Sequence, residues 1–144
     1  MSIARVSALE AHDLVRREAY TIVDVRTEAE YAGGHPAGAY NVPVVLAAAG
    51  GMAANARFVA DVRALFPSDA KLLLGCQSGQ RSLRAAELLA AAGYSALVDL
   101  RPGFAGARDP FGRVTEPGWQ AAGCPCEVVT PGCSYAELRA RIPG

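Results

Sequence analysis

A cysteine followed closely by a glycine, an arginine and a serine is the part of this sequence best suited to chemistry. The segment reads Cys76-Gln77-Ser78-Gly79-Gln80-Arg81-Ser82 and lies between the apolar run 72–74 and an Ala- and Leu-rich stretch, 83–92, with helical spacing. This order predicts a strand, a loop and a helix. The N-terminus of a helix favours an anion, and Arg81 is expected to supply the main positive charge of the site. Both effects stabilise the thiolate, so the segment predicts a nucleophilic Cys76.

The other residues of this loop have types that suit an anion on sulfur. Gly79 permits the backbone angles of a cradle in which the N–H groups of residues 77–81 point at one centre. Arg81 either binds the oxyanion of a donor or holds the loop in shape, and Ser82 either caps the helix or donates to the sulfur. The uncharged side chains lining the loop, which are expected to tune the choice of donor, are Gln77, Ser78 and Gln80.

The elements around this loop alternate between strand and helix signals. Strands are expected at 20–25, 71–75 and 96–100, and helices follow the capping-box patterns Ser7 with Glu10 and Thr27 with Glu30. Further helices are expected at 58–66, 83–92 and 134–141. The alternation predicts an α/β fold with a central parallel sheet and helices on both faces.

Two stretches carry more specific expectations. Asn55 is expected to cap the helix at 58–66, in which Asp61 would face water. Residues 101–118 are rich in Gly, Pro and Arg and are expected to form one extended loop within a single domain, 1–144.

Bulk composition excludes several classes of protein. The 144 residues are 51% hydrophobic and 19% charged with zero formal net charge, which indicates a globular domain without a general nucleic-acid or anionic-membrane surface. The sequence carries no signal-peptide pattern and no apolar stretch of transmembrane length. Four cysteines without a leader predict reduced thiols in the cytoplasm. No motif implies a metal, nucleotide or flavin cofactor.

Several short motifs, in their order along the chain, give the sequence a family resemblance. They are Asp24-Val25-Arg26, Glu30-Tyr31, Gly34-His35, Gly38-Ala39, Asn41-Val42-Pro43, the Cys76 loop, Asp99-Leu100, Gly103-Phe104 and Trp119. Together they resemble the single-domain rhodanese (thiosulfate sulfurtransferase) family. Pro36 stands one place earlier than in the family's usual motif, and residues 107–117 are extra relative to a minimal member.

The resemblance implies a single rhodanese-like domain that transfers sulfur by double displacement. Cys76 would attack the outer sulfur of a small anionic donor such as thiosulfate and hold it as a persulfide. A second nucleophile, which is cyanide or a small or protein thiol, would then remove that sulfur. This is covalent catalysis with ping-pong kinetics.

Other interpretations stay open beside this one. The same residues would serve a persulfide carrier or a partner-binding module with little thiosulfate turnover. A cysteine phosphatase or arsenate reductase is disfavoured, because only four residues separate Cys76 from Arg81. The group Cys124, Cys126 and Cys133 fits ordinary thiols better than zinc or a resolving thiol.

The charged and titratable residues of the first motifs are expected to have structural roles. Asp24 and Arg26 are expected to pair with each other or with the backbone rather than to act in catalysis. His35, in a Gly- and Pro-containing turn, is expected to fix that turn by a hydrogen bond. Because a thiolate at a helix N-terminus needs no general base, His35 is not expected to activate Cys76.

Overall fold

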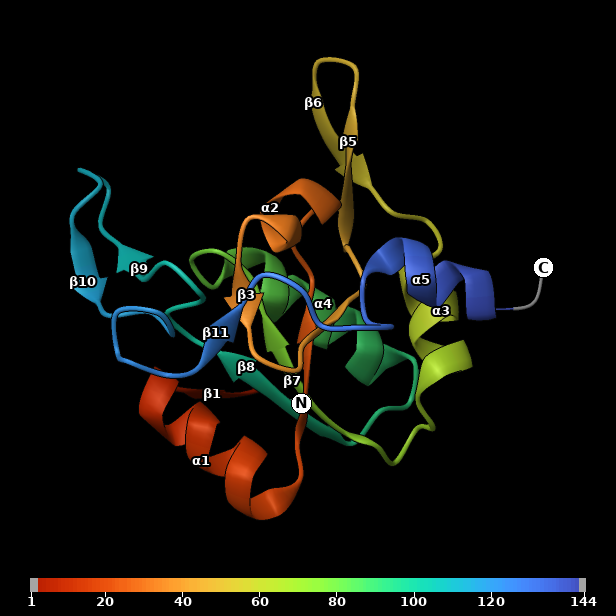
Figure 1. Ribbon diagram of the computed structural model, residues 1–144, viewed down its shortest axis with the longest axis horizontal. Helices are drawn as coiled ribbons and strands as arrows, with labels where there is room; N and C mark the ends of the chain where they lie inside the picture. Colours follow the sequence, from red (N-terminus) through yellow and green to blue (C-terminus); the bar gives the residue numbers. More distant parts are fainter. Residues whose placement is uncertain (1–2, 143–144) are drawn as a thin grey trace.

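A five-stranded parallel sheet forms the centre of the protein (Figure 1). The computed structural model describes residues 3–142, so both ends of the expected domain, 1–2 and 143–144, lie outside the described residues. The strand order across the sheet is β1 (Ala4–Val6), β8 (Ala96–Leu100), β7 (Lys71–Gly75), β2 (Thr21–Asp24) and β4 (Tyr40–Asn41). Every neighbouring pair is parallel, which confirms the expected α/β class.

Helices cover both faces of this sheet, because the strands are apolar on both sides. Side chains alternate along β7, so that Leu72 and Leu74 join one core cluster and Leu73 joins the other. The first cluster also holds residues of α3 (Phe58–Leu65), α4 (Gln80–Ala91) and α5 (Tyr135–Arg141). The second cluster holds residues of α1 (Ala8–Glu18) and α2 (Glu28–Ala32), together with Trp119.

Local capping fixes where several helices begin. The side chains of Ser7 and Thr27 accept the N–H groups of Glu10 and Glu30 in full capping boxes, which confirms both predicted starts. Ser134 does the same for α5. The helix α4 begins at Gln80, earlier than the predicted 83, because Gly79 turns the chain directly into the helix.

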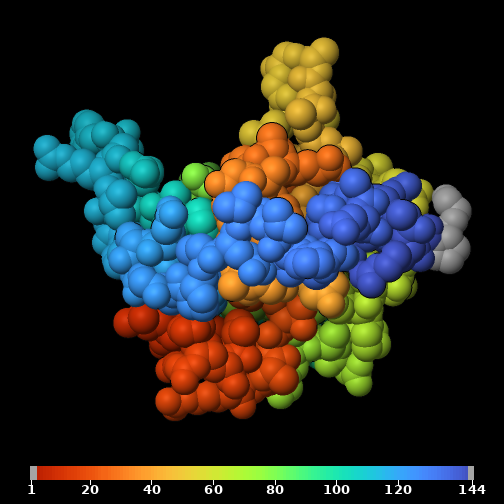
Figure 2. All heavy atoms as spheres, in the orientation of Figure 1, coloured from red at the N-terminus to blue at the C-terminus, as the bar shows by residue number. Residues whose placement is uncertain are grey.

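The expectation of one loop at 101–118 is wrong, because this stretch contains a small hairpin. Its strands, β9 (Ala107–Arg108) and β10 (Val114–Glu116), are antiparallel. The Asp109 carboxylate accepts the N–H groups of Phe111 and Arg113, each at 2.9 Å, and so builds the turn. The hairpin stands out from the body of the molecule (Figure 2). Its two short strands lack the β-branched alternation that predicts a strand.

Two further ribbons complete the fold. The hairpin of β5 (Val45–Ala48) and β6 (Gly51–Ala54) projects from the body in Figure 2. The second ribbon pairs β3 (His35–Pro36) with β11 (Cys126–Glu127) and so joins segments that are distant in the sequence.

The environment of α3 differs from the expectation in two respects. Arg57, not Asn55, is the N-cap residue, and no side chain caps the helix. The Asn55 Oδ1 still accepts the N–H of Arg57 at 3.1 Å, while its amide donates to the carbonyl oxygen of Pro43 at 2.8 Å. Asp61 does not face water, because its side chain is fully buried and receives hydrogen bonds from Tyr135 and Arg139.

Candidate active site

Cys76 follows directly after β7 and faces the beginning of α4. Its side chain is buried, with 2% exposed. The Gly79 N–H donates to the Cys76 Sγ at 3.1 Å, and the thiol donates to the Ser82 Oγ at 3.3 Å. Once the thiol has lost its proton, the Ser82 hydroxyl can donate to the sulfur, with the Asp99 carboxylate as a competing acceptor. The sulfur therefore lies between a backbone N–H and a buried hydroxyl at a helix N-terminus.

Gly79 is required at the tight turn between Cys76 and the helix. Its φ of 99° lies in the left-handed region, which other residues adopt only at a cost. A Cβ at this position would lie 2.0 Å from the Arg101 carbonyl oxygen. The Gly79 carbonyl in turn accepts the Arg5 Nη2 at 3.0 Å, and Arg5 is held by Asp99. The turn is thus fixed from both sides.

The start of the 101–118 segment runs along the backbone of the cysteine. The N–H groups of Phe104 and Ala105 donate to the carbonyl oxygens of Cys76 and Gln77, at 2.7 and 2.9 Å. The segment comes so close that a Cβ on Gly103 would lie 2.6 Å from the Gln77 carbonyl. Residues 103–105 therefore pack against the backbone of Cys76 and Gln77 and hold it in place.

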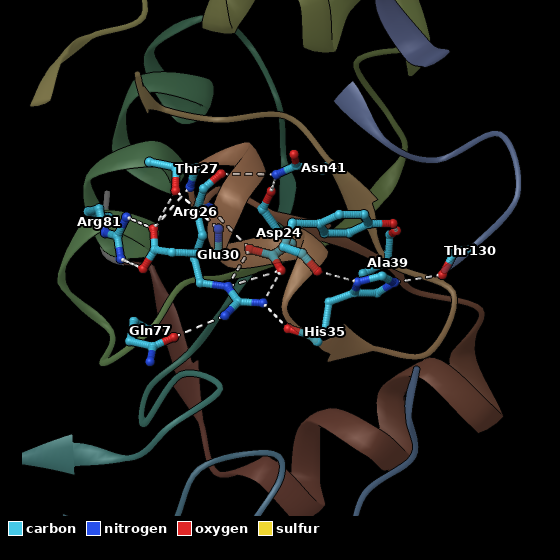
Figure 3. Close-up of polar contacts among 12 residues, drawn as sticks. Asp24, Arg26, Thr27, Glu30, His35, Ala39, Asn41, Gln77, Arg81 and Thr130 are labelled. Carbon is cyan, nitrogen blue, oxygen red and sulfur yellow. Dashed lines mark hydrogen bonds and ion pairs between the residues drawn. The ribbon is translucent and has the colours of Figure 1, made fainter. Parts of the chain in front are cut away.

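Arg26 connects the loop to the sheet (Figure 3). Its side chain is only 3% exposed, donates to both carboxylate oxygens of Asp24, and reaches Gln77 Oε1 at 3.0 Å and the Gly34 carbonyl oxygen at 2.7 Å. The guanidinium also lies over the Phe104 ring, 4.7 Å from its centre. The expected pairing of Asp24 with Arg26 is confirmed.

Arg81 forms a two-pronged ion pair with Glu30 of α2 (Figure 3). Arg81 Nη1 and Nη2 lie 2.7 and 2.9 Å from the two Glu30 carboxylate oxygens. The Arg81 guanidinium is the main cause that lowers the pKa of Glu30 to about 2. Arg81 was expected either to bind the oxyanion of a donor or to hold the loop in shape, and its contact with Glu30 matches the second alternative. The sequence assigns Glu30 to a helix cap and to one of the family motifs, but no sequence signal connects it to Arg81.

The arginines nearest the loop are therefore paired with carboxylates. Arg5 pairs with Asp99, Arg26 with Asp24 and Arg81 with Glu30. Their net effect on an anion at Cys76 is reduced by these partners. The groups left to attract an anion are the N–H groups of the first turn of α4, which have no carbonyl partner within the helix. The expectation that Arg81 is the main charge of the site stays a prediction.

The remaining loop residues are distributed between the interior and the surface. Gly79 and Ser82 are buried, Gln77 is half-buried, and Ser78 and Gln80 are exposed. The expectation that Gln77, Ser78 and Gln80 tune the choice of donor stays a prediction.

The other candidate residues lie outside the Cys76 loop. His35 is fully buried, its Nδ1 is 2.8 Å from the Tyr31 carbonyl oxygen and its Nε2 is 2.8 Å from Thr130 Oγ1. The expected turn-fixing contact is confirmed. Cys124, Cys126 and Cys133 are free thiols whose pKa values are raised by burial. Within residues 3–142, no group of three or more His, Cys, Asp or Glu could hold a metal ion.

Comparison with known proteins identifies the class of protein that this fold and loop define. Residues 7–109, well over half of the chain, match the rhodanese-like domain. The protein therefore belongs to the rhodanese-like domain family. In the described part of the chain, no helix has the length and apolar character needed to cross a membrane.

Individual relatives agree with this family. Thiosulfate sulfurtransferase 16, a chloroplastic protein of Arabidopsis thaliana, is 38% identical over 99 residues, which cover 69% of this chain and 82% of the relative. Senescence-associated protein DIN1 of Raphanus sativus is 38% identical over 85 residues, 59% of this chain and 46% of the relative. The chain thus spans about half the length of this second relative.

Solved structures share the fold. Rv0390 from M. tuberculosis superposes with a TM-score of 0.72 and 30% identity, covering 89% of this chain and 100% of that chain. The human single-domain sulfurtransferase TSTD1 superposes with a TM-score of 0.58 and 23% identity, covering 72% of this chain and 93% of that chain. The second likeness shows the fold alone.

Proposed function

We propose that this protein is a sulfurtransferase that carries sulfur as a persulfide on Cys76, with thiosulfate or a similar anion as the donor. The observation that carries the proposal is the placement of the Cys76 Sγ between the Gly79 N–H and the Ser82 hydroxyl at the N-terminus of α4. Family membership and the names of the relatives support the same chemistry.

The first half-reaction forms the persulfide. The Cys76 thiolate attacks the outer sulfur of thiosulfate, a new S–S bond forms, and the bond between the two thiosulfate sulfur atoms breaks. Sulfite leaves with the electron pair of that bond. The negative charge moves outward by one atom, to the terminal sulfur of the persulfide, where the free N–H groups of the loop and of the first helical turn can stabilise it.

The second half-reaction returns the enzyme to its starting state. A thiolate or cyanide attacks the terminal sulfur, the S–S bond of the persulfide breaks, and Cys76 leaves as a thiolate. If the natural acceptor is a protein thiol, the same residues make the chain a persulfide carrier with slow turnover of small acceptors.

Steady-state kinetics test this proposal. With thiosulfate and cyanide, we expect parallel lines in double-reciprocal plots, as required when sulfite leaves before cyanide binds, and no hydrolysis of an aryl phosphate. Cys76→Ser should abolish transfer. Intersecting lines, or turnover that survives in Cys76→Ser, would contradict a persulfide on Cys76. Aryl phosphate hydrolysis without sulfur transfer would favour the phosphatase interpretation instead.

A further inference from the structure

A groove of about 570 Å³ opens beside the Cys76 loop. It lies between α3, α4 and the base of the β5–β6 hairpin, whose arrangement can be followed in Figure 1. No step proposed above uses this groove. The residues that form most of its apolar wall are Val44, Val45, Phe58, Val59 and Leu88.

The groove reaches the reactive loop at one end. Gln80 and Arg81, the last residues of the Cys76 loop and the first of α4, both contribute to its lining. A molecule lying in the groove therefore ends beside the loop that holds the sulfur. Because the Arg81 guanidinium is turned to Glu30, this end of the groove carries a compensated charge.

Among the described residues that line the groove, Arg84 is the cation without an ion-pair partner. It lies on α4 four residues after Gln80 and four before Leu88, so the three share one face of the helix. The Arg84 side chain is exposed, and no ion pair among residues 3–142 includes it. The described residues that line the groove include no carboxylate. A negative group in the groove would therefore find an unpaired guanidinium and no acidic neighbour in the lining.

We infer that this groove binds the sulfur acceptor, and that the acceptor is an organic thiol with an apolar chain and a carboxylate. The chain would lie over Phe58, Val59 and Leu88, and Arg84 would bind the carboxylate. The inference rests on the proposed function. In the transfer step the acceptor thiolate attacks the terminal sulfur of the Cys76 persulfide, a new S–S bond forms, the persulfide S–S bond breaks, and the products are an organic persulfide anion and the Cys76 thiolate.

The test measures the second half-reaction alone. Protein is loaded with thiosulfate, freed of excess donor, and checked by intact mass for one added sulfur. It is then mixed with 6-mercaptohexanoate or with 6-mercaptohexanol, which has the same chain without the charge. The readout is the ratio of the two transfer rate constants within each variant, so that differences in loading or folding cancel.

We expect Arg84→Gln to lower this ratio about fivefold, which corresponds to one partly exposed ion pair of about 1 kcal/mol. Arg84→Lys should retain most of the ratio. Arg17→Gln, which removes an exposed arginine from α1 on the opposite face of the sheet, should leave it unchanged. Ala56→Phe places a ring in the groove and should slow both thiols relative to cyanide.

Two outcomes would overturn the inference, and they are distinguishable from failure of the proposed function. A ratio equal in wild type and Arg84→Gln would remove Arg84 as the carboxylate partner. Equal slowing of cyanide and both thiols by Ala56→Phe would remove the groove as the acceptor site. If wild-type protein gains no sulfur, the proposed function itself fails, and this inference falls with it.

Discussion

The sulfur of Cys76 has two polar neighbours that differ in kind. The Gly79 N–H belongs to the backbone and is fixed by the turn, whereas the Ser82 hydroxyl belongs to a side chain that can be removed. Because Ser82 is fully buried, water cannot readily replace its hydroxyl. This makes Ser82 the residue through which stabilisation of the thiolate can be measured separately from the shape of the loop.

Ser82→Ala is expected to slow persulfide formation from thiosulfate about tenfold, since a hydrogen bond to a charged group contributes about 1.5 kcal/mol or more. The measurement is the rate of sulfur gain by Cys76 in a single turnover. Ser68→Ala, an exposed serine before β7, serves as the control. An unchanged rate in Ser82→Ala would show that the hydroxyl does not act on the sulfur.

The pair between Arg81 and Glu30 predicts a pH dependence of stability. The pKa of Glu30 is lowered from 4.5 to about 2 in the folded protein, mainly by Arg81. A lowered folded-state pKa gives a contribution that is fully present above pH 4.5 and is lost as the pH falls toward 2. The free energy of unfolding of wild type should therefore exceed that of Glu30→Gln by more at pH 6 than at pH 3.

Chemical denaturation of both proteins at the two pH values checks this. Asp13→Asn is the control. It removes a carboxylate that lies 3.9 Å from Arg16 on the exposed side of α1, and it shows how much the unfolding free energy changes when a weak surface pair is lost. A constant difference between wild type and Glu30→Gln across this range would mean that Glu30 is not ion-paired in solution.

At the scale of elements, the turn from β7 into α4 decides whether the thiol meets the helix. Gly79→Ala should destabilise the protein by about 2 kcal/mol or more for two reasons. Alanine is strained at this left-handed φ, and its Cβ would lie 2.0 Å from the Arg101 carbonyl oxygen. Sulfur transfer should fall at least about tenfold, as expected when a reacting atom is misplaced.

Gly93→Ala is a matched control for this prediction. Gly93 has a similar φ of 104° at the end of α4, but a Cβ there meets nothing within 4 Å. Gly93→Ala should lower the free energy of unfolding only by the strain of alanine at this φ, about 1–2 kcal/mol, and should leave sulfur transfer unchanged. Equal stability losses and equal activities in the two variants would contradict a clash at Gly79.

Elements with strong local signals could be predicted from the sequence. The strands at 71–75 and 96–100 match β7 and β8, because each is a continuous apolar or β-branched run between turn residues. The hairpins β5–β6 and β9–β10 were not predicted from the sequence, because the first is mainly Ala and Gly and the second has strands of two and three residues. Neither sequence carries the alternation that distinguishes a strand.

At the scale of the whole molecule, contacts between distant segments account for what the sequence could not predict. The loop itself is contiguous in sequence, so its seven residues could be identified from their types. Its supports come from elsewhere: Glu30 from α2, Arg5 from β1 and the backbone of residues 103–105. The cytoplasmic setting and the domain limits of 1–144 stay predictions.

The docking of α5 is a second such contact. Asp61 has the spacing of a surface residue on α3, yet the Tyr135 hydroxyl donates to it and also accepts the Asn55 amide at 3.2 Å. Tyr135→Phe would leave buried polar groups without that partner, so we expect a loss of about 1–3 kcal/mol in the free energy of unfolding. Tyr20→Phe, on the other core cluster, should change it by less than about 0.5 kcal/mol. Equal values for the two variants would contradict the buried Tyr135 contact.

The most direct test of the central claim is the intact mass of the protein after incubation with thiosulfate, before and after cyanide, beside Cys76→Ser. A persulfide on Cys76 predicts a gain of about 32 Da, one sulfur atom, that cyanide removes and that Cys76→Ser never acquires. The same gain in Cys76→Ser would assign the sulfur to another thiol, and no gain in wild type would contradict thiosulfate as the donor.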